Sequence, residues 1–337
     1  MQAPPIPLPG PIARLPAEHA PVLLVVVDTE EEFDWNAPFD RANTGVTHMQ
    51  RIGEFQSLCD SLGVRPVYVI DHPIATQPEA YEPLRAIHAS GRCEIGAHLH
   101  PWVSPPFEEE VNARNSYPGN LPRALERAKL ESLVAAIEKN VGVRPVSYKA
   151  GRYGFGPNTA ATLAELGFRC DLSFCPAFDL SSDGGPDYSE FGCEPAWLDE
   201  RSKLLSLPTT GAFVGWAASS GTYRFAQSLR GLRLPGIASR LRAVERLHLS
   251  PEGYSEADNE RLTLALFARG LRVFTLALHS PSLATGHTEY VRDEAQRQQF
   301  LASIRRYIEF FFSDLGGRNM TARELHERLL KTPAVPA

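Results

Sequence analysis

The feature that most constrains the fold is an alternation of strand-like and helix-like segments along the chain. Short runs rich in β-branched residues alternate with longer segments whose apolar residues recur every three or four positions. The strand-like runs span residues 22–28, 65–71, 93–100, 145–151, 170–174 and 271–279. The helix-like segments span residues 50–63, 79–91, 121–142, 157–168, 255–270, 292–316 and 321–330. This alternation is typical of βαβ units around a parallel sheet.

Two stretches fall outside the alternation. Residues 1–20 are rich in proline and predict an extended, poorly ordered arm. Residues from about 179 to 250 begin with a region rich in Gly, Pro, Ser and Asp, which predicts an insert of loops and short strands. The chain contains no internal repeat and no linker between autonomous units, so we expect residues 21–337 to form one domain that carries this insert.

Composition excludes several classes of protein. The chain has 34 Lys and Arg against 40 Asp and Glu, and this net charge of -6 argues against a nucleic-acid-binding protein. Apolar runs are far shorter than the roughly 18 residues of a membrane-spanning helix. Since the N-terminus also does not look like a signal peptide, we expect a cytoplasmic protein without a transmembrane segment. The five cysteines lack CxxC spacing and predict buried free thiols.

Ionisable residues gather where the predicted strands end. In parallel α/β folds the loops converge over the core at the carboxyl ends of the strands, and functional groups collect there. Here those ends carry Asp28 and Glu30, Asp71 and His72, His98 and His100, Lys149 and Arg152, Asp171, and His279. Each strand end that we can assign therefore carries a titratable side chain.

The first strand ends on an unusually acidic stretch, DTEEEFDW. Clustered carboxylates repel one another unless they are solvated or a cation lies among them. His98 and His100 are two residues apart on an extended segment, so both side chains point the same way and can share one ion. Two imidazoles and a carboxylate suit zinc, or else cobalt or manganese, acting on water. We expect Glu31, Glu32 and Asp34 to be solvated loop acids without a role.

Five motifs occur in the order found in the NodB-homology polysaccharide deacetylases, a carbohydrate esterase family that the chain resembles, most closely in its WalW-like branch. The motifs are DTEEEFDW at 28–35, EIGAHLHPW at 94–102, AGRYGFGPNTAATLAELGF at 150–168, CDLSF at 170–174 and LALHSPSL at 276–283. The likeness runs from about Val22 to Phe312. It implies an α/β fold, an irregular (β/α) barrel of about seven parallel strands. It also implies a metal-dependent hydrolase that removes an N- or O-linked acetyl group from a sugar or glycan precursor.

Two departures from the family's pattern affect the metal site. The family's first motif has adjacent aspartates, whereas Thr29 separates Asp28 from Glu30 here. We assign Asp28 as the base and Glu30 as the metal ligand, because both point the same way on an extended backbone, and the reverse assignment stays open. The family's metal histidines are separated by three residues, but here only Leu99 intervenes.

We keep His98 and His100 as the metal histidines, with His72 as the substitute for His100. The resemblance implies that Asp28 takes the proton of the attacking water and that His279 protonates the departing amine. Arg152 would orient Asp28, and Asp171 would orient His279. For sugar contacts we expect the aromatic residues Trp35, Trp102 and Tyr153. Burial of the tryptophans beside the barrel rim, a capping role for Asp171 and a structural ion pair for Arg152 are the alternatives.

The expected partner is an acetylated sugar or a carrier-linked glycan precursor. The Arg-rich segment 224–246 resembles an amphipathic helix that could contact anionic lipid headgroups or a carrier phosphate, although a solvated helix face is the favoured explanation. Two other functions fit the same residues. One is a sugar-binding protein without catalysis, and the other is a metal-free glycoside hydrolase that uses paired acids.

Overall fold

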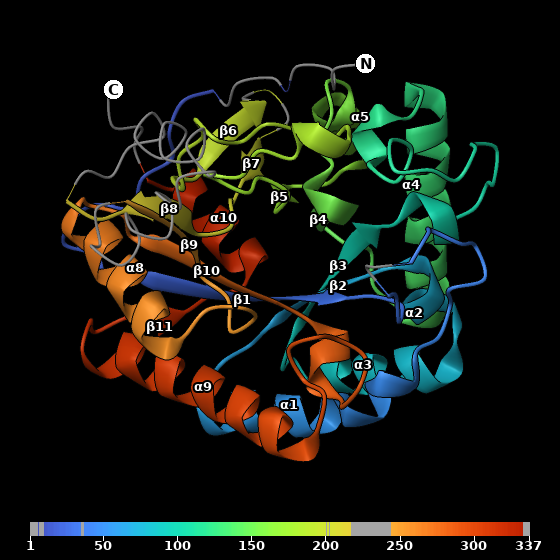
Figure 1. Ribbon diagram of the computed structural model, residues 1–337. Helices are drawn as coiled ribbons and strands as arrows, with labels where there is room; N and C mark the ends of the chain where they lie inside the picture. Colours follow the sequence, from blue (N-terminus) through green and yellow to red (C-terminus); the bar gives the residue numbers. More distant parts are fainter. Residues whose placement is uncertain are drawn as a thin grey trace, which may run out of the picture.

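The apolar run at residues 22–28 becomes the central strand of a large sheet. β1 (Val22–Thr29) is buried along its whole length and pairs in parallel on both sides. The computed structural model describes residues 6, 10–34, 37–199, 201, 203–216 and 244–332. Seven strands run parallel in the order β10 (Val273–His279), β1, β2 (Val67–Ile70), β3 (Glu94–Leu99), β4 (Ser147–Ala150), β5 (Cys170–Asp171) and β7 (Leu204–Ser206) (Figure 1). The short β11 (Arg318–Asn319) also pairs with β1.

The predicted (β/α) barrel architecture is confirmed as a curled, mostly parallel sheet that remains a half-barrel. β6 (Ala196–Asp199) runs antiparallel to β7 at one edge, and β10 forms the other edge. Hydrogen bonds bridge part of the opening. Thr275 of β10 donates its N–H to Thr210 Oγ1 (2.8 Å) and its hydroxyl to the Pro208 carbonyl (2.9 Å). A separate hairpin of β8 (Gly211–Val214) and β9 (Glu245–His248) follows this contact in the chain.

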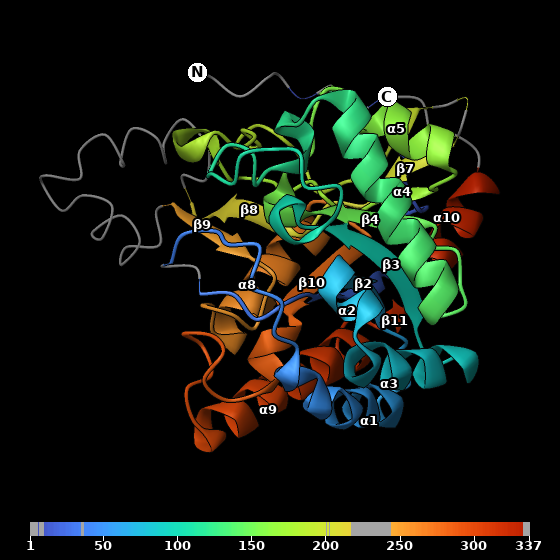
Figure 2. The same cartoon turned by 90° about the vertical axis from the view of Figure 1, so that its right-hand side faces the viewer.

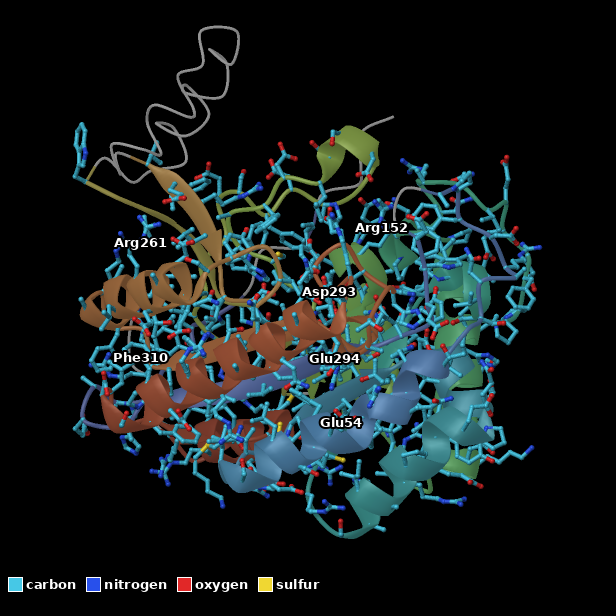
Figure 3. The ribbon with its side chains drawn as sticks, turned by 60° about the horizontal axis from the view of Figure 1, so that its bottom comes forward. Glu54, Arg152, Arg261, Asp293, Glu294 and Phe310 are labelled. Atoms are coloured by element: carbon cyan, nitrogen blue, oxygen red, sulfur yellow. The ribbon has the colours of Figure 1, made fainter. Side chains whose placement is uncertain are left out.

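The helices pack against the sheet as the alternation predicted. They are α1 (Ile52–Ser61), α2 (His72–Thr76), α3 (Pro78–Ala89), α4 (Arg123–Asn140), α5 (Thr159–Leu166), α8 (Glu256–Ala268), α9 (Glu294–Ser313) and α10 (Ala322–Leu330). α9, α1 and α3 lie along one side of the molecule (Figures 1 and 2). Buried Arg297 of α9 joins two of them, because it pairs with Glu54 of α1 (2.8 Å) and with Glu294 (2.6 Å), both labelled in Figure 3.

The helix ends follow from local sequence. Ser255 caps α8 and Thr321 caps α10, each in a reciprocal capping box. Gly167 ends α5 in the left-handed conformation (φ 83°), which glycine adopts without steric cost. All five cysteines are buried and free, as predicted. Among the described helices, none combines the length and the apolar character that crossing a bilayer requires.

Two segments differ from the predictions. Part of the proline-rich arm lies along β6 rather than free, since Gly10 donates its N–H to the Trp197 carbonyl (2.9 Å) and Ala13 donates to that of Pro195 (2.8 Å). The insert was predicted to contain short strands, and one of them, β7, joins the main parallel sheet, which the prediction did not include. Of the Arg-rich segment 224–246, only residues 244–246 lie within the described part of the chain.

A buried lysine fixes the loop that follows β3. Lys129 of α4 donates from Nζ to the carbonyl oxygens of Pro101 (3.0 Å), Ser104 (2.6 Å) and Pro106 (2.7 Å). The Glu109 carboxylate lies 2.9 Å from the same nitrogen and balances its charge. Because this loop begins directly after His100, Lys129 holds the end of β3 against α4.

We predict that Lys129→Met lowers the free energy of unfolding by about 3–5 kcal/mol, because it leaves a buried carboxylate and three carbonyls without their cation. Urea denaturation measures the change. The matched control is Arg127→Ala on the same helix, where exposed ion pairs contribute about 1 kcal/mol or less. Equal losses in the two variants would mean that Lys129 does not hold the loop.

Candidate functional site

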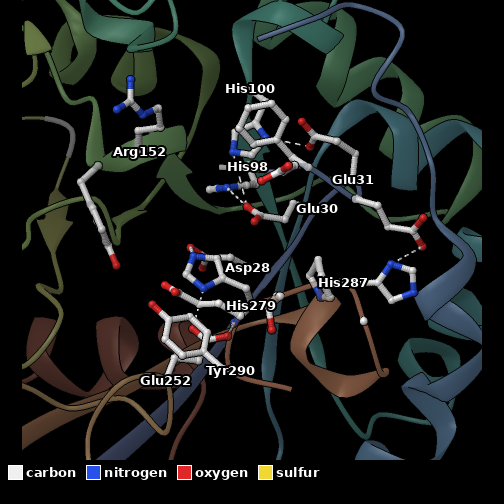
Figure 4. A pocket seen from close by; sticks show the side chains of 18 of the residues that line it. Asp28, Glu30, Glu31, His98, His100, Arg152, Glu252, His279, His287 and Tyr290 are labelled. Carbon is white, nitrogen blue, oxygen red and sulfur yellow. Dashed lines mark hydrogen bonds and ion pairs between the residues drawn. The ribbon is translucent and has the colours of Figure 1, made fainter. Parts of the chain in front are cut away.

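The carboxyl ends of β1, β3, β4 and β10 meet at one cleft of about 760 Å³ (Figure 4). Parallel register brings their last residues together, because Asp28 pairs with His279 across β1 and β10, and His98 pairs with Lys149 across β3 and β4. Its lining includes six ionisable side chains that lie near one another, namely Asp28, Glu30, His98, His100, Glu252 and His279. The strand-end argument therefore located this cleft correctly.

Glu30, His98 and His100 converge as a buried group. Glu30 Oε2 lies 3.2 Å from His98 Nε2 and 3.4 Å from His100 Nε2. The three side chains each offer one ligand atom within 4.8 Å of the others, so together they could hold a metal ion. The alternation of β3 explains the arrangement, since it places both imidazoles on the face opposite Leu99. His72, the substitute, belongs to none of the metal-capable groups among the described residues.

The hydrogen bonds on the far side of each ring orient the two imidazoles. His98 Nδ1 donates to the Lys149 carbonyl oxygen (3.0 Å), and His100 Nδ1 donates to Glu31 Oε2 (2.8 Å). In a neutral ring the proton then sits on Nδ1, which leaves the Nε2 lone pair directed at Glu30. Metal-binding histidines commonly have this arrangement, with the second nitrogen bonded to a carbonyl or carboxylate.

Burial leaves this group short of positive charge. It raises the pKa of Glu30 to about 7 and lowers the pKa of His100 to about 4. Two lone pairs and a carboxylate oxygen therefore meet with no permanent cation at their centre, and that repulsion is relieved by a proton or a metal ion. The donor set of two imidazoles and a carboxylate fits a divalent metal.

Asp28 forms a buried ion pair with Lys149. Both carboxylate oxygens lie 2.7 Å from Lys149 Nζ. Although burial opposes ionisation, Lys149 holds the pKa of Asp28 below its usual value. The prediction that Arg152 orients Asp28 is therefore wrong, because Lys149, near the end of β4, holds both oxygens of its carboxylate. The signal was present, since Lys149 stood among the strand-end residues without an assigned role.

Glu252 holds His279. Its Oε2 accepts a hydrogen bond from His279 Nδ1 (2.6 Å), and its Oε1 accepts one from the His279 backbone N–H (3.2 Å). His279 Nε2 faces Asp28 Oδ2 at 3.7 Å. Burial opposes the charged ring, but Glu252 and Glu30 raise the pKa of His279 to about 10. The imidazolium is therefore the prevailing form at neutral pH.

The predicted contact between Asp171 and His279 is wrong. Asp171 Oδ1 accepts a hydrogen bond from Ser173 Oγ (2.6 Å), and Ser173 Oγ accepts one from the Ala150 N–H (2.8 Å). Through Ser173, Asp171 thus links β5 to β4, and it makes no hydrogen bond to His279 among those of the described residues. Sequence reasoning missed Glu252, because it lies in a loop after β9 and no motif marks it.

Arg152 and Tyr153 line the cleft through an unusual backbone. Both adopt left-handed conformations (φ 55° and 59°), which non-glycine residues reach only with strain, and such strain clusters at functional sites. The Arg152 guanidinium donates to Ser116 Oγ (2.6 Å), pairs with Asp183 and lies over the Tyr117 ring. Arg152 is therefore an ion-paired residue at the cleft, as its alternative interpretation held.

Trp102 packs behind Glu30, His98 and His100, called the metal group below because the three could hold a metal ion, and does not face the cleft. Its side chain is 1% exposed, and its ring stacks on His100 with the centroids 4.3 Å apart. The predicted sugar contact is therefore wrong, and burial, the alternative, is observed. Tyr153 does line the cleft, with Lys149 Nζ 4.9 Å from its ring centroid. Trp35 lies outside the described residues.

Glu31 and Glu32 are not solvated loop acids. Glu31 is fully buried, accepts the hydrogen bond from His100, and donates its own N–H to Asp71 Oδ2 (2.8 Å). Burial raises the pKa of Glu31 to about 8. Glu32 accepts a hydrogen bond from Thr47 Oγ1 (2.6 Å). Consecutive acids looked solvated in the sequence because nothing local showed that the chain turns inward after β1.

Gly151 leaves room for His100. A Cβ atom at this position would overlap the His100 ring and the Leu99 carbonyl oxygen. We predict that Gly151→Ala displaces His100 and lowers the free energy of unfolding by about 1–3 kcal/mol. Gly53→Ala in α1, where nothing lies within 4 Å, is the control and should be neutral or stabilising by up to about 1 kcal/mol. Urea denaturation of both variants tests this, and unchanged stability of Gly151→Ala would contradict it.

Solved structures share the fold of this chain. No model of a protein family and no curated protein matches. A protein from Mycobacterium smegmatis described as a polysaccharide deacetylase is 16% identical, with 98% of each chain covered and a TM-score of 0.55. One from Pseudomonas aeruginosa PAO1, described likewise, is 16% identical, with 95% of this chain and 93% of that chain covered and a TM-score of 0.51.

The Puue allantoinase also matches, with 16% identity, 97% of this chain and 95% of that chain covered, and a TM-score of 0.52. At this level of identity the likeness establishes the fold alone. The resemblance to polysaccharide deacetylases that the motifs predicted is therefore confirmed as a shared fold. The WalW-like branch is not confirmed.

Proposed function

We propose that this protein is a metal-dependent hydrolase that removes an N- or O-linked acetyl group from a sugar or a carrier-linked glycan precursor. The observation that carries the proposal is the meeting of three arrangements in one cleft: the Glu30, His98 and His100 group, the Asp28 and Lys149 pair, and the Glu252 and His279 pair. The fold shared with structures described as deacetylases supports the choice of substrate. Because an allantoinase shares the fold too, the substrate must be tested directly.

Glu30, His98 and His100 are the residues that would hold the metal, and zinc suits them best, with cobalt or manganese as alternatives. When bound, a divalent ion supplies Lewis acidity at the acetyl carbonyl and lowers the pKa of water. Glu31 and the Lys149 carbonyl keep the two imidazoles in the tautomer that binds metal.

Asp28 and His279 then divide the proton transfers. Asp28 is ionised and fixed by Lys149, so it accepts the proton of the attacking water as the new C–O bond forms. His279 is protonated, and Glu252 holds its Nδ1, which leaves the Nε2 proton for the leaving atom. As the bond between the acetyl carbon and the sugar nitrogen or oxygen breaks, that proton neutralises the departing amine or alcohol, and acetate is released.

Metal content and acetate release test the proposal together. We expect about one divalent ion per purified chain by elemental analysis and acetate release from N- or O-acetylated sugars, with both lost in His98→Ala and both kept in the control. His326→Ala is the control, because it removes a buried histidine of α10 whose Nε2 contacts the Lys203 carbonyl. Metal binding without turnover would favour the sugar-binding protein. Sugar cleavage without metal would favour the glycoside hydrolase.

We predict that Glu252→Gln shifts the alkaline limb of the pH profile of kcat/KM to lower pH. The acid works in its protonated form, so activity should persist up to about pH 10 in the wild type, where the pKa of His279 lies. Without the Glu252 charge the ring loses its proton at lower pH. Glu309→Gln, which changes an exposed glutamate of α9 outside the cleft, should leave the limb in place. An unmoved limb in Glu252→Gln would remove His279 from the role of acid.

A further inference from the structure

A second set of polar side chains joins the end of β1 to the end of β10 behind the metal group. The Glu30 N–H donates to Ser280 Oγ (3.3 Å), Ser280 Oγ lies 2.8 Å from His48 Nε2, and His48 Nδ1 lies 3.2 Å from Glu32 Oε1. Ser280 is 0% exposed and His48 is 1% exposed. The chain thus runs through buried groups from one acid of the DTEEEFDW motif to another.

The three hydrogen bonds that link Glu30, Ser280, His48 and Glu32 all run in one direction, from donor to acceptor. A carboxylate oxygen only accepts, so His48 Nδ1 carries the hydrogen and Nε2 of the neutral ring is the acceptor. Ser280 must then donate its hydroxyl hydrogen to His48, and its lone pair accepts from the Glu30 N–H. Burial, which lowers the pKa of His48, favours the neutral ring. Ser280 and His48 thus each use one donor and one acceptor along the path.

The far end of the chain is firmly anchored. Glu32 Oε1 accepts hydrogen bonds from Thr47 Oγ1 (2.6 Å) and from the His48 backbone N–H (2.8 Å), in addition to the one from the His48 ring. Both donors belong to η1 (Thr47–Arg51), a short 3₁₀ helix that precedes α1. Glu32 therefore fastens η1 to the segment that follows β1.

The near end begins where regular pairing stops. Asp28 with His279 is the last pair of the ladder between β1 and β10. Beyond it, Ser280 opens η7 (Ser280–Leu283), and its hydroxyl receives the N–H of Glu30. Ser280 thus continues the connection between the two strands for one more step, at the residue that contacts His98 and His100.

We propose that Glu32, His48 and Ser280 act as one positioning unit that holds Glu30 in place for metal binding. The unit acts on the metal group through the hydrogen bond that Ser280 Oγ accepts from the backbone N–H of Glu30. The inference rests on the proposed function, because it takes Glu30 as a metal ligand. Outer hydrogen bonds of this kind change metal affinity or activity by about 10–100-fold.

Zinc affinity of the metal-free protein, measured by titration calorimetry, tests the unit. We expect Ser280→Ala and His48→Ala each to weaken zinc binding by about 10–100-fold. The double variant should have the same zinc affinity as the single variant that binds zinc more weakly, because either substitution already interrupts the row of hydrogen bonds. His48→Gln keeps an amide that can accept from Ser280, so it should bind zinc more tightly than His48→Ala.

His326→Ala is the matched control, since this histidine is also buried (2% exposed) and also makes a ring hydrogen bond, but it lies in α10. It should lower stability without changing zinc affinity. Wild-type affinity in both single variants, or additive losses in the double variant, would overturn the inference and leave the proposed function standing. If the wild type itself binds no zinc, the proposed function fails first. Should Ser280→Ala not fold, the comparison of His48→Ala with His48→Gln decides.

Discussion

The site depends on the burial of charge at the end of β1. Asp28, Glu30 and Glu31 all leave water there, and each must meet a partner or stay neutral. The chain solves this differently for each acid. Lys149 neutralises Asp28, and His100 Nδ1 donates a hydrogen bond to Glu31. Glu30 faces the Nε2 lone pairs of two imidazoles. Glu30 therefore lies against uncharged ring nitrogens, at the point where the donor atoms suit a metal.

The sheet makes this arrangement rigid. The groups come from β1, β3, β4 and β10, and parallel register fixes how far each strand end projects. Loops supply the supports: Glu252 after β9, Glu31 after β1, and the turn at Arg152 and Tyr153 after β4. The same fold can serve different functions when the residues of its cleft and loops change, and structures described as a polysaccharide deacetylase and an allantoinase share this fold.

The sequence was enough to predict the parallel sheet, the cleft and the convergence of Glu30, His98 and His100, because periodicity and strand ends are local signals. It did not predict which side chains pair when the two residues lie far apart in the sequence. Lys149 rather than Arg152 meets Asp28, and Glu252 rather than Asp171 meets His279. Those choices depend on distances between strand ends and loops far apart in the chain. Burial of Glu31 and Trp102 likewise depends on how the chain turns after β1 and β3, which composition does not reveal.

The pair of Asp28 and Lys149 has a consequence for folding. The two residues are 121 positions apart, and β2 and β3 lie between their strands in the sheet. A partly assembled sheet that buries either charge alone carries the full cost of desolvation. Adding β1, β2, β3 and β4 to the sheet one at a time therefore lowers the free energy little. We expect this half of the sheet to form in a single cooperative step. Because that step closes a long loop, it should also be slow.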